Sequence, residues 1–156
     1  MRATMYELVS GYAAATGCGC KAEEGSCQAS LTVEGLEIQI GLVESSGMMA
    51  FQTGVALLPP HGREELCLKL LAANNLFGET SGFTLGVDEE QELVTLQLAW
   101  DISRLEAEGF AHIVHNLLSV AADWMVRLDE WRPAAQKTAQ GSEARPGIPP
   151  LSFLQV

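Results

Sequence analysis

The sequence predicts an α+β domain in which helices pack on a single antiparallel sheet. Several short runs alternate apolar and polar residues with a period of two, which is typical of strands with one buried face. Most of these runs are joined by short links, which antiparallel strands allow and parallel strands do not. Apolar residues at helical spacing lie at the start, middle and end of the chain. The predicted order is therefore α-β-β-β-α-β-β-α.

The chain is predicted to begin with an amphipathic helix over residues 4–16. Its apolar residues at helical spacing are Met5, Leu8, Val9, Tyr12 and Ala13. Gly17 and Gly19 end this helix, and residues 20–26 read as a loop.

Three strands follow in a predicted antiparallel meander. Leu31 and Val33 alternate with polar neighbours in the first strand. Residues 36–44 alternate strictly, and the turn at 45–47 leads to a third strand over 48–59.

A middle helix is predicted over residues 63–76, after Pro59 and Pro60 end the third strand. Leu66, Leu70 and Ala73 mark one of its sides. The helix ends at Asn74, Asn75 and Gly78, since Asn and Gly accept the left-handed backbone that often follows a helix.

A second hairpin and a long helix complete the predicted domain, residues 1–132. Residues 82–88 and 93–100 alternate like strands, and the linker between them is too acidic to be buried. Residues 103–131 carry an apolar stripe that runs from Phe110 to Trp131. Residues 133–156 hold four of the six prolines with little periodicity, which predicts a flexible tail.

The charge of the chain excludes some classes of partner. The formal net charge is -11 and the pI is about 4.6. No Lys or Arg lies between Ala22 and Gly62, or between Leu70 and Ser103. Nucleic acids and anionic membranes both require a basic face, so the sequence predicts neither as a partner.

The sequence also predicts a cytoplasmic protein with reduced cysteines. The first 20 residues lack a long apolar core and include Glu7, so they do not read as a signal peptide. No run of residues approaches the length of a membrane span.

Two residue clusters raise the question of metal or thiol chemistry. Cys18 and Cys20 are one residue apart, Cys27 follows, and no His lies near them, so ordinary thiols are favoured over a zinc site. Cys67, on the middle helix, is expected in the core.

Glu108, His112 and His115 share one side of the last helix, where a solvated polar stripe is favoured over metal ligands. No nucleophile elbow and no phosphate-binding loop occur. Nothing in the sequence predicts catalytic residues, a metal or a cofactor.

One long block resembles a known family. The segment "LLAANNLF…GFTLGVDEEQELVTLQLAW", followed by a helix with "FAHIVHNLLSVAADWMVRL", is similar to the Tir chaperone family, the class I chaperones of type III secretion. The likeness spans roughly residues 4–131, and chain size, acidity and element order agree with it. The cysteine-rich first loop and the proline-rich tail depart from the family pattern.

The resemblance implies a homodimeric chaperone that is not an enzyme and acts without ATP. Such a protein binds the N-terminal chaperone-binding segment of a secreted effector, keeps it extended and soluble, and delivers it to the secretion apparatus. It also raises the secretion ATPase as a further partner. The alternatives are a related adaptor or regulator with another protein partner, and a metal or thiol enzyme that uses Cys18, Cys20 and Cys27.

The resemblance also implies where partners bind. The first helix and first three strands would contact the client. The expected client residues are Leu8, Tyr12, Leu31, Val33, Ile38, Ile40 and Phe51. The middle helix and adjoining strand would form the dimer contact. The expected dimer residues are Leu66, Leu70, Ala73, Phe83 and Leu85. For all of these positions a place in the core competes with the binding role, because one face of each strand must cover the core.

Overall fold

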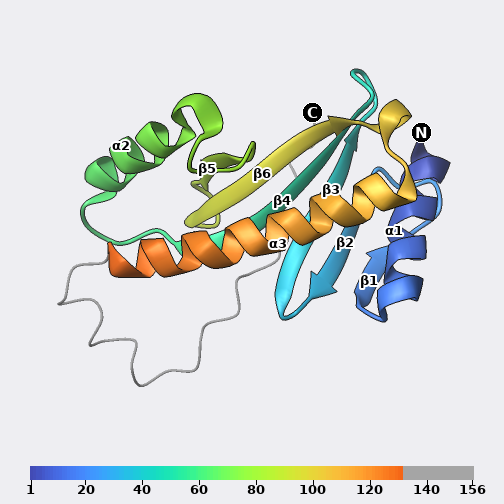
Figure 1. Cartoon of the computed structure of the whole chain (residues 1–156), viewed down its shortest axis with the longest axis horizontal. Coiled ribbons are helices and arrows are strands. Elements are labelled where there is room, and N and C mark those ends of the chain that lie inside the picture. Colours follow the sequence, from blue (N-terminus) through green and yellow to red (C-terminus); the bar gives the residue numbers. More distant parts are fainter. Residues whose placement is uncertain (132–156) are drawn as a thin grey trace.

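The computed structural model describes residues 1–131 and contains one antiparallel sheet with three α helices (Figure 1). The elements are α1 (Arg2–Thr16), β1 (Gly19–Ala22), β2 (Gln28–Val33), β3 (Leu36–Val43), β4 (Met48–Leu57), α2 (Arg63–Asn74), the 3-10 turn η1 (Asn75–Phe77), β5 (Thr84–Asp88), β6 (Leu93–Asp101), the 3-10 turn η2 (Ile102–Arg104) and α3 (Ala107–Glu130). The predicted fold class and element order are confirmed. The predicted tail, residues 133–156, lies outside the described residues.

The sheet has the strand order β1-β2-β3-β4-β6-β5, and all neighbouring strands are antiparallel. Strands β1 to β4 form a meander. The β5–β6 hairpin then joins through β6, so that β1 and β5 are the two edge strands. Figure 1 shows α3 crossing the sheet along its length, with α1 beside β1 and α2 at the other end beside β5.

One strand lies where a loop was predicted. Residues 20–26 were expected to form a loop, but Cys20 and Lys21 belong to β1 and pair with Leu31 and Ser30 of β2. The first three residues of β1 are exposed. Main-chain pairing with β2 holds this strand in place. Because its side chains do not alternate between buried and exposed, its sequence lacks the period-two pattern that predicts a strand.

The core lies between one face of the sheet and the helices, with the largest helical share from α3. Leu31, Ile40 and Phe51 project from neighbouring strands and are fully buried. The ring of Phe51 lies 5.6 Å from that of Phe110 on α3. The apolar stripe predicted for the last helix is buried along α3. Its buried members are Phe110, Ile113, Val114, Leu117, Ala121, Trp124 and Leu128.

The other face of the sheet is polar. Gln39, Gln52 and Gln97 stand side by side on β3, β4 and β6 because the strand register aligns them. Each is at least partly exposed. Around these glutamines the second face of the sheet is in contact with water, as is common in antiparallel sheets, whereas Leu93 and Thr95 further along β6 are buried.

Helix α2 ends earlier than predicted. Its last residue is Asn74, and Leu76 and Phe77 both adopt a left-handed backbone, with φ of 57° and 56°. Two consecutive apolar residues in this region are unfavourable, so the turn is shaped by its surroundings.

No helix within residues 1–131 is long and apolar enough to cross a membrane.

Candidate protein-binding surfaces

The residues expected to contact a client divide into two groups. Leu31, Ile38, Ile40 and Phe51 have 0% exposure and belong to the core beneath the helices. Their side chains are therefore unavailable to a partner in this conformation. Leu8, Tyr12 and Val33 are half-buried at the border of the same core, where a partner can reach them.

Two of these half-buried residues, Leu8 and Tyr12, line an apolar groove between α1 and α3. Leu8, Gly11, Tyr12 and Ala15 line it from α1, and Ala107 and Ala111 line it from α3.

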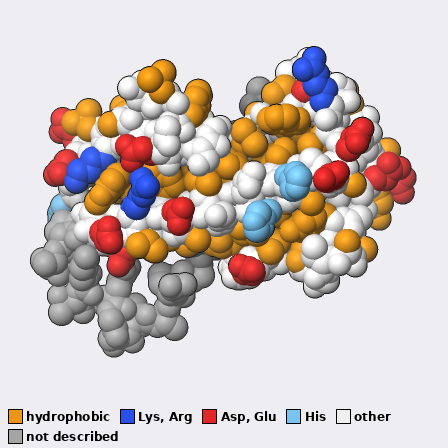
Figure 2. Space-filling view, viewed as in Figure 1, with side chains coloured by type: hydrophobic (Ala, Val, Ile, Leu, Met, Phe, Trp, Pro, Cys, Tyr) orange, Lys and Arg blue, Asp and Glu red, His pale blue; other side chains and the backbone are white. Residues whose placement is uncertain are grey.

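Small side chains keep this groove open. Gly11, Ala15, Ala107 and Ala111 add little volume along it. Tyr12 also lines the groove, its ring lies 5.6 Å from that of Phe110, and burial raises the pKa of the Tyr12 hydroxyl. Such a groove can accept apolar side chains of a partner chain. Figure 2 shows hydrophobic side chains bordering α3 over much of its length.

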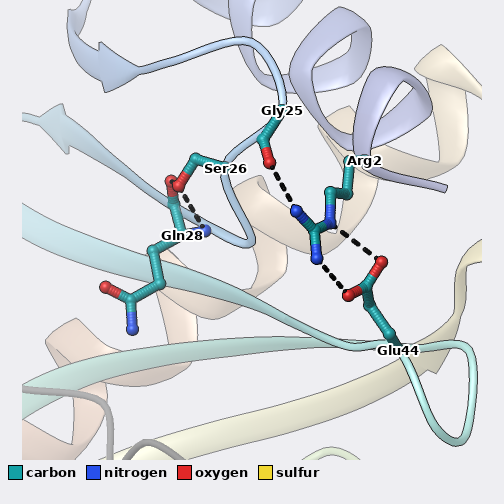
Figure 3. Close-up of polar contacts among 5 residues, drawn as sticks. All are labelled: Arg2, Gly25, Ser26, Gln28 and Glu44. Carbon is teal, nitrogen blue, oxygen red and sulfur yellow. Dashed lines mark hydrogen bonds and ion pairs between the residues drawn. The ribbon is translucent and has the colours of Figure 1, made fainter.

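A polar cluster fixes α1 to the strands beside this groove (Figure 3). The guanidinium of Arg2 donates two hydrogen bonds to the carboxylate of Glu44, one of them at 2.9 Å. It donates a third to the carbonyl oxygen of Gly25 at 3.0 Å. Arg2 thus ties the start of α1 to both the β1–β2 link and the β3–β4 hairpin.

The same contacts shift two pKa values in opposite directions. The hydrogen bonds from Arg2 lower the pKa of the Glu44 carboxyl below its usual value. The Glu44 carboxylate in turn raises the pKa of Arg2. Both groups favour their charged forms, as expected for a hydrogen-bonded ion pair.

The cysteines lie around the edge strand β1. Cys18 and Cys27 are half-buried and Cys20 is exposed, and all three are free thiols. Partial burial raises the pKa of the Cys20 thiol, which disfavours the reactive thiolate. Within residues 1–131, no three His, Cys, Asp or Glu side chains are grouped as metal ligands would be. Cys67, expected in the core, is half-buried on α2.

Glu108, His112 and His115 are all exposed on α3. Histidine side chains are visible among hydrophobic ones on the outward side of this helix (Figure 2). This arrangement fits a solvated polar stripe.

The residues expected at a dimer contact are mostly buried within the single chain. Leu70, Ala73, Phe83 and Leu85 are at most 4% exposed, and only Leu66 is half-buried. These side chains hold α2 against the body of the domain, so a contact at α2 would have to use the side of the helix that faces away from them.

That outward side carries large apolar residues that were not among those predicted for the dimer contact. Leu68 and Leu71 on α2 are 62% and 66% exposed, and Leu76 and Phe77 in η1 are 88% and 54% exposed. Hydrophobic side chains gather over α2 and η1 in Figure 2. The three-residue spacing of Leu68 and Leu71 was the signal available in the sequence, since it places both on one helix side.

Leu76 and Phe77 are exposed by the backbone itself. Their left-handed conformation presents two apolar side chains to water at the end of α2. Strained backbone combined with exposed apolar groups is more common at binding surfaces than elsewhere. We call the set Leu68, Leu71, Leu76 and Phe77 the α2 face.

These features define a small α+β domain whose candidate sites are apolar surfaces suited to protein partners. The match of residues 7–125 to the Tir chaperone protein (CesT) family covers most of the chain. The chain belongs to this family.

Solved structures of similar fold agree with the family assignment. The ExsC–ExsE complex contains a chain with a TM-score of 0.70 and 19% identity, and the match covers 86% of this chain and 98% of that one. A chain of the HopA1–SchA chaperone–effector complex matches with a TM-score of 0.61 and 14% identity, over 80% of this chain and 94% of that one. A chain of the heterodimeric ExoU–SpcU complex of the Pseudomonas aeruginosa type III secretion system matches with a TM-score of 0.53 and 18% identity, over 65% of this chain and 82% of that one.

These identities are low, so the likenesses establish the fold alone. No match was found among curated proteins.

Proposed function

We propose that this protein is a type III secretion chaperone that binds the N-terminal segment of a secreted effector. It keeps that segment extended and soluble and presents it to the secretion apparatus, without catalysis and without nucleotide. Membership of the Tir chaperone family carries this proposal. The apolar groove between α1 and α3 supports it, because an extended segment can place side chains there while its main chain pairs with the nearby edge strand β1.

The charge of the chain suits such a client. The net charge of -11 keeps a protein with exposed apolar surfaces soluble and attracts a basic segment over a distance. Glu7 stands at the groove itself. The expected client is therefore an extended segment with apolar residues at intervals and basic residues between them.

We further propose that the chaperone is a homodimer that associates through the α2 face. Beneath this contact lies a layer of the residues that the sequence predicted for the dimer: Leu66, Leu70, Ala73, Phe83 and Leu85. A twofold interface suits this surface because each copy supplies the same apolar patch to the other. The secretion ATPase is proposed as a further partner of the loaded chaperone on family grounds alone.

The client proposal is tested first by purifying the tagged chain from its native cell and identifying the protein that accompanies it. A secreted protein bound through its N-terminal segment, with or without nucleotide, is the expected result. A partner that is not secreted, or that binds through a folded domain, would support the adaptor alternative instead.

The groove is then tested by Ala111→Glu, which places a charge among its apolar residues while retaining a good helix former. Burying a charge against an apolar partner is costly, so binding of the client segment should weaken by about tenfold or more. Ala122→Glu is the matched control, since Ala122 is exposed elsewhere on α3. Isothermal titration should show a loss for Ala111→Glu only, with an unchanged circular dichroism spectrum. Equal affinities for the two variants would show that the client binds elsewhere.

A further inference from the structure

The side chain of Asn74 pairs with the edge of the sheet. Asn74 is the last residue of α2, and its amide nitrogen donates a hydrogen bond of 2.9 Å to the carbonyl oxygen of Leu85. The amide of Leu85 donates one of 2.8 Å to the side-chain oxygen of Asn74. A carboxamide carries a donor and an acceptor side by side, so Asn74 offers Leu85 the same pair of bonds as a residue on a neighbouring strand.

Leu85 is the second residue of β5, an edge strand whose one partner strand within residues 1–131 is β6. In an antiparallel strand, alternate residues turn their main-chain groups away from the neighbour. On β5, those residues are Leu85 and Val87. Asn74 occupies the groups of Leu85, so Val87 is left as one isolated pairing position, which is too little for a partner strand.

The opposite edge of the sheet differs. Strand β1 pairs with β2, and among the hydrogen bonds of residues 1–131 none reaches its other side. Unpaired edges accept strands from other chains, so proteins usually block the edges that must stay free. The two edges of this sheet are thus unequal: one is closed by a side chain and the other is open.

We infer that Asn74 is a positioning residue that closes the β5 edge and thereby assigns the client strand to the β1 edge. This inference rests on the proposed function for its client part. Its structural part, the closure of β5, concerns the free protein and stands separately.

The closure is tested in the free full-length protein by amide hydrogen exchange with Asn74→Ala. Loss of the bond from the Leu85 amide should speed its exchange by roughly tenfold, given the usual net strength of one such bond. Asn74→Asp keeps the acceptor for the Leu85 amide and loses only the donor to the Leu85 carbonyl oxygen, so it should retain more of the protection of the Leu85 amide than Asn74→Ala does. Asn75→Ala is the matched control, because Asn75 is exposed and its side chain makes no hydrogen bond within residues 1–131. Equal exchange of Leu85 in wild type and Asn74→Ala would overturn the closure.

The opened edge should also attract strands. Asn74→Ala should form species larger than those of the wild type as concentration rises, through pairing of β5 edges, and Asn75→Ala should not. With the N-terminal segment of the co-purified client added, the wild type should gain protection at the amides of β1. Asn74→Ala should gain it at Leu85 and Val87 as well.

If the client segment slowed amide exchange in β5 and left amide exchange in β1 unchanged in the wild type, the assignment of the client strand to the β1 edge would be overturned. If the wild type binds no secreted client at all, the proposed function fails. The exchange of Leu85 in the free protein still decides whether Asn74 closes the edge.

Discussion

Replacing Leu71 by Gln should weaken a homodimer formed through the α2 face without unfolding the chain. Leu71 is 66% exposed, so most of its apolar surface remains to be buried by a partner. Full burial of a leucine side chain is worth about 2 kcal/mol, and roughly two-thirds of that is about 1.3 kcal/mol per copy. A twofold interface contains the residue twice, which gives about 2.6 kcal/mol, or roughly an 80-fold rise in the dissociation constant.

Sedimentation velocity across a concentration series measures this constant directly. Val43→Gln is the control, because Val43 is also an exposed apolar residue, at 46%, but lies on β3 away from α2. Leu70→Ala provides the contrast within α2. Leu70 is 3% exposed, so its truncation should cost about 2–5 kcal/mol of folding stability instead of acting on the dimer alone.

Two results would refute the reasoning. A wild-type protein that sediments as a monomer at micromolar concentration has no dimer to weaken. A Leu71→Gln protein with the dissociation constant of the wild type would show that any dimer uses another surface. Equal weakening by Val43→Gln would point to a general effect of lost apolar surface.

Two further predictions concern the tail and the ion pair of α1. Removal of residues 133–156 should leave the melting temperature nearly unchanged, since these residues are rich in proline and have too few periodic apolar positions to offset their ordering entropy. A fall of many degrees in a thermal melt would show instead that they dock on the body of the domain. The second is a pH dependence. Arg2 lowers the folded-state pKa of Glu44 below its ordinary value of 4.5. The stability that the Arg2–Glu44 ion pair contributes is therefore present above pH 4.5 and disappears as the pH falls through the lower, folded-state pKa. The melting temperature of Glu44→Gln should accordingly depend less on pH than that of the wild type across the acidic range, and parallel curves for the two proteins would contradict this.

The sequence alone determined most of the architecture. Alternation over residues 36–44 revealed β3, whose alternate residues Ile38, Ile40 and Leu42 are buried in the core. Alternate apolar residues also revealed β6, although its first four residues, 93–96, are all buried. The apolar stripe from Phe110 to Leu128 revealed α3, because one side of this helix is buried and its apolar residues recur at helical spacing. Strand β1 escaped because its side chains are exposed and its stability comes from main-chain pairing with β2.

The tertiary structure decided which apolar residues are available to partners. Periodicity places Leu31 and Phe51 on one side of their strands and Leu71 on one side of its helix, but it does not say what covers that side. The helices packed on the sheet cover Leu31 and Phe51, which are fully buried, whereas nothing within residues 1–131 covers Leu71. A client role for the buried pair would require a change of conformation, whereas the groove beside Tyr12 is accessible as it stands.

The role of Asn74 shows the same division. The sequence placed this residue at the end of a helix, since Asn is common where helices stop. Its pairing with Leu85 depends on the turn at residues 75–83, which brings β5 back beside the end of α2. Local propensity acts over a few neighbours in the chain, whereas this contact joins residues brought together by packing of the whole domain, so only the folded structure decides it.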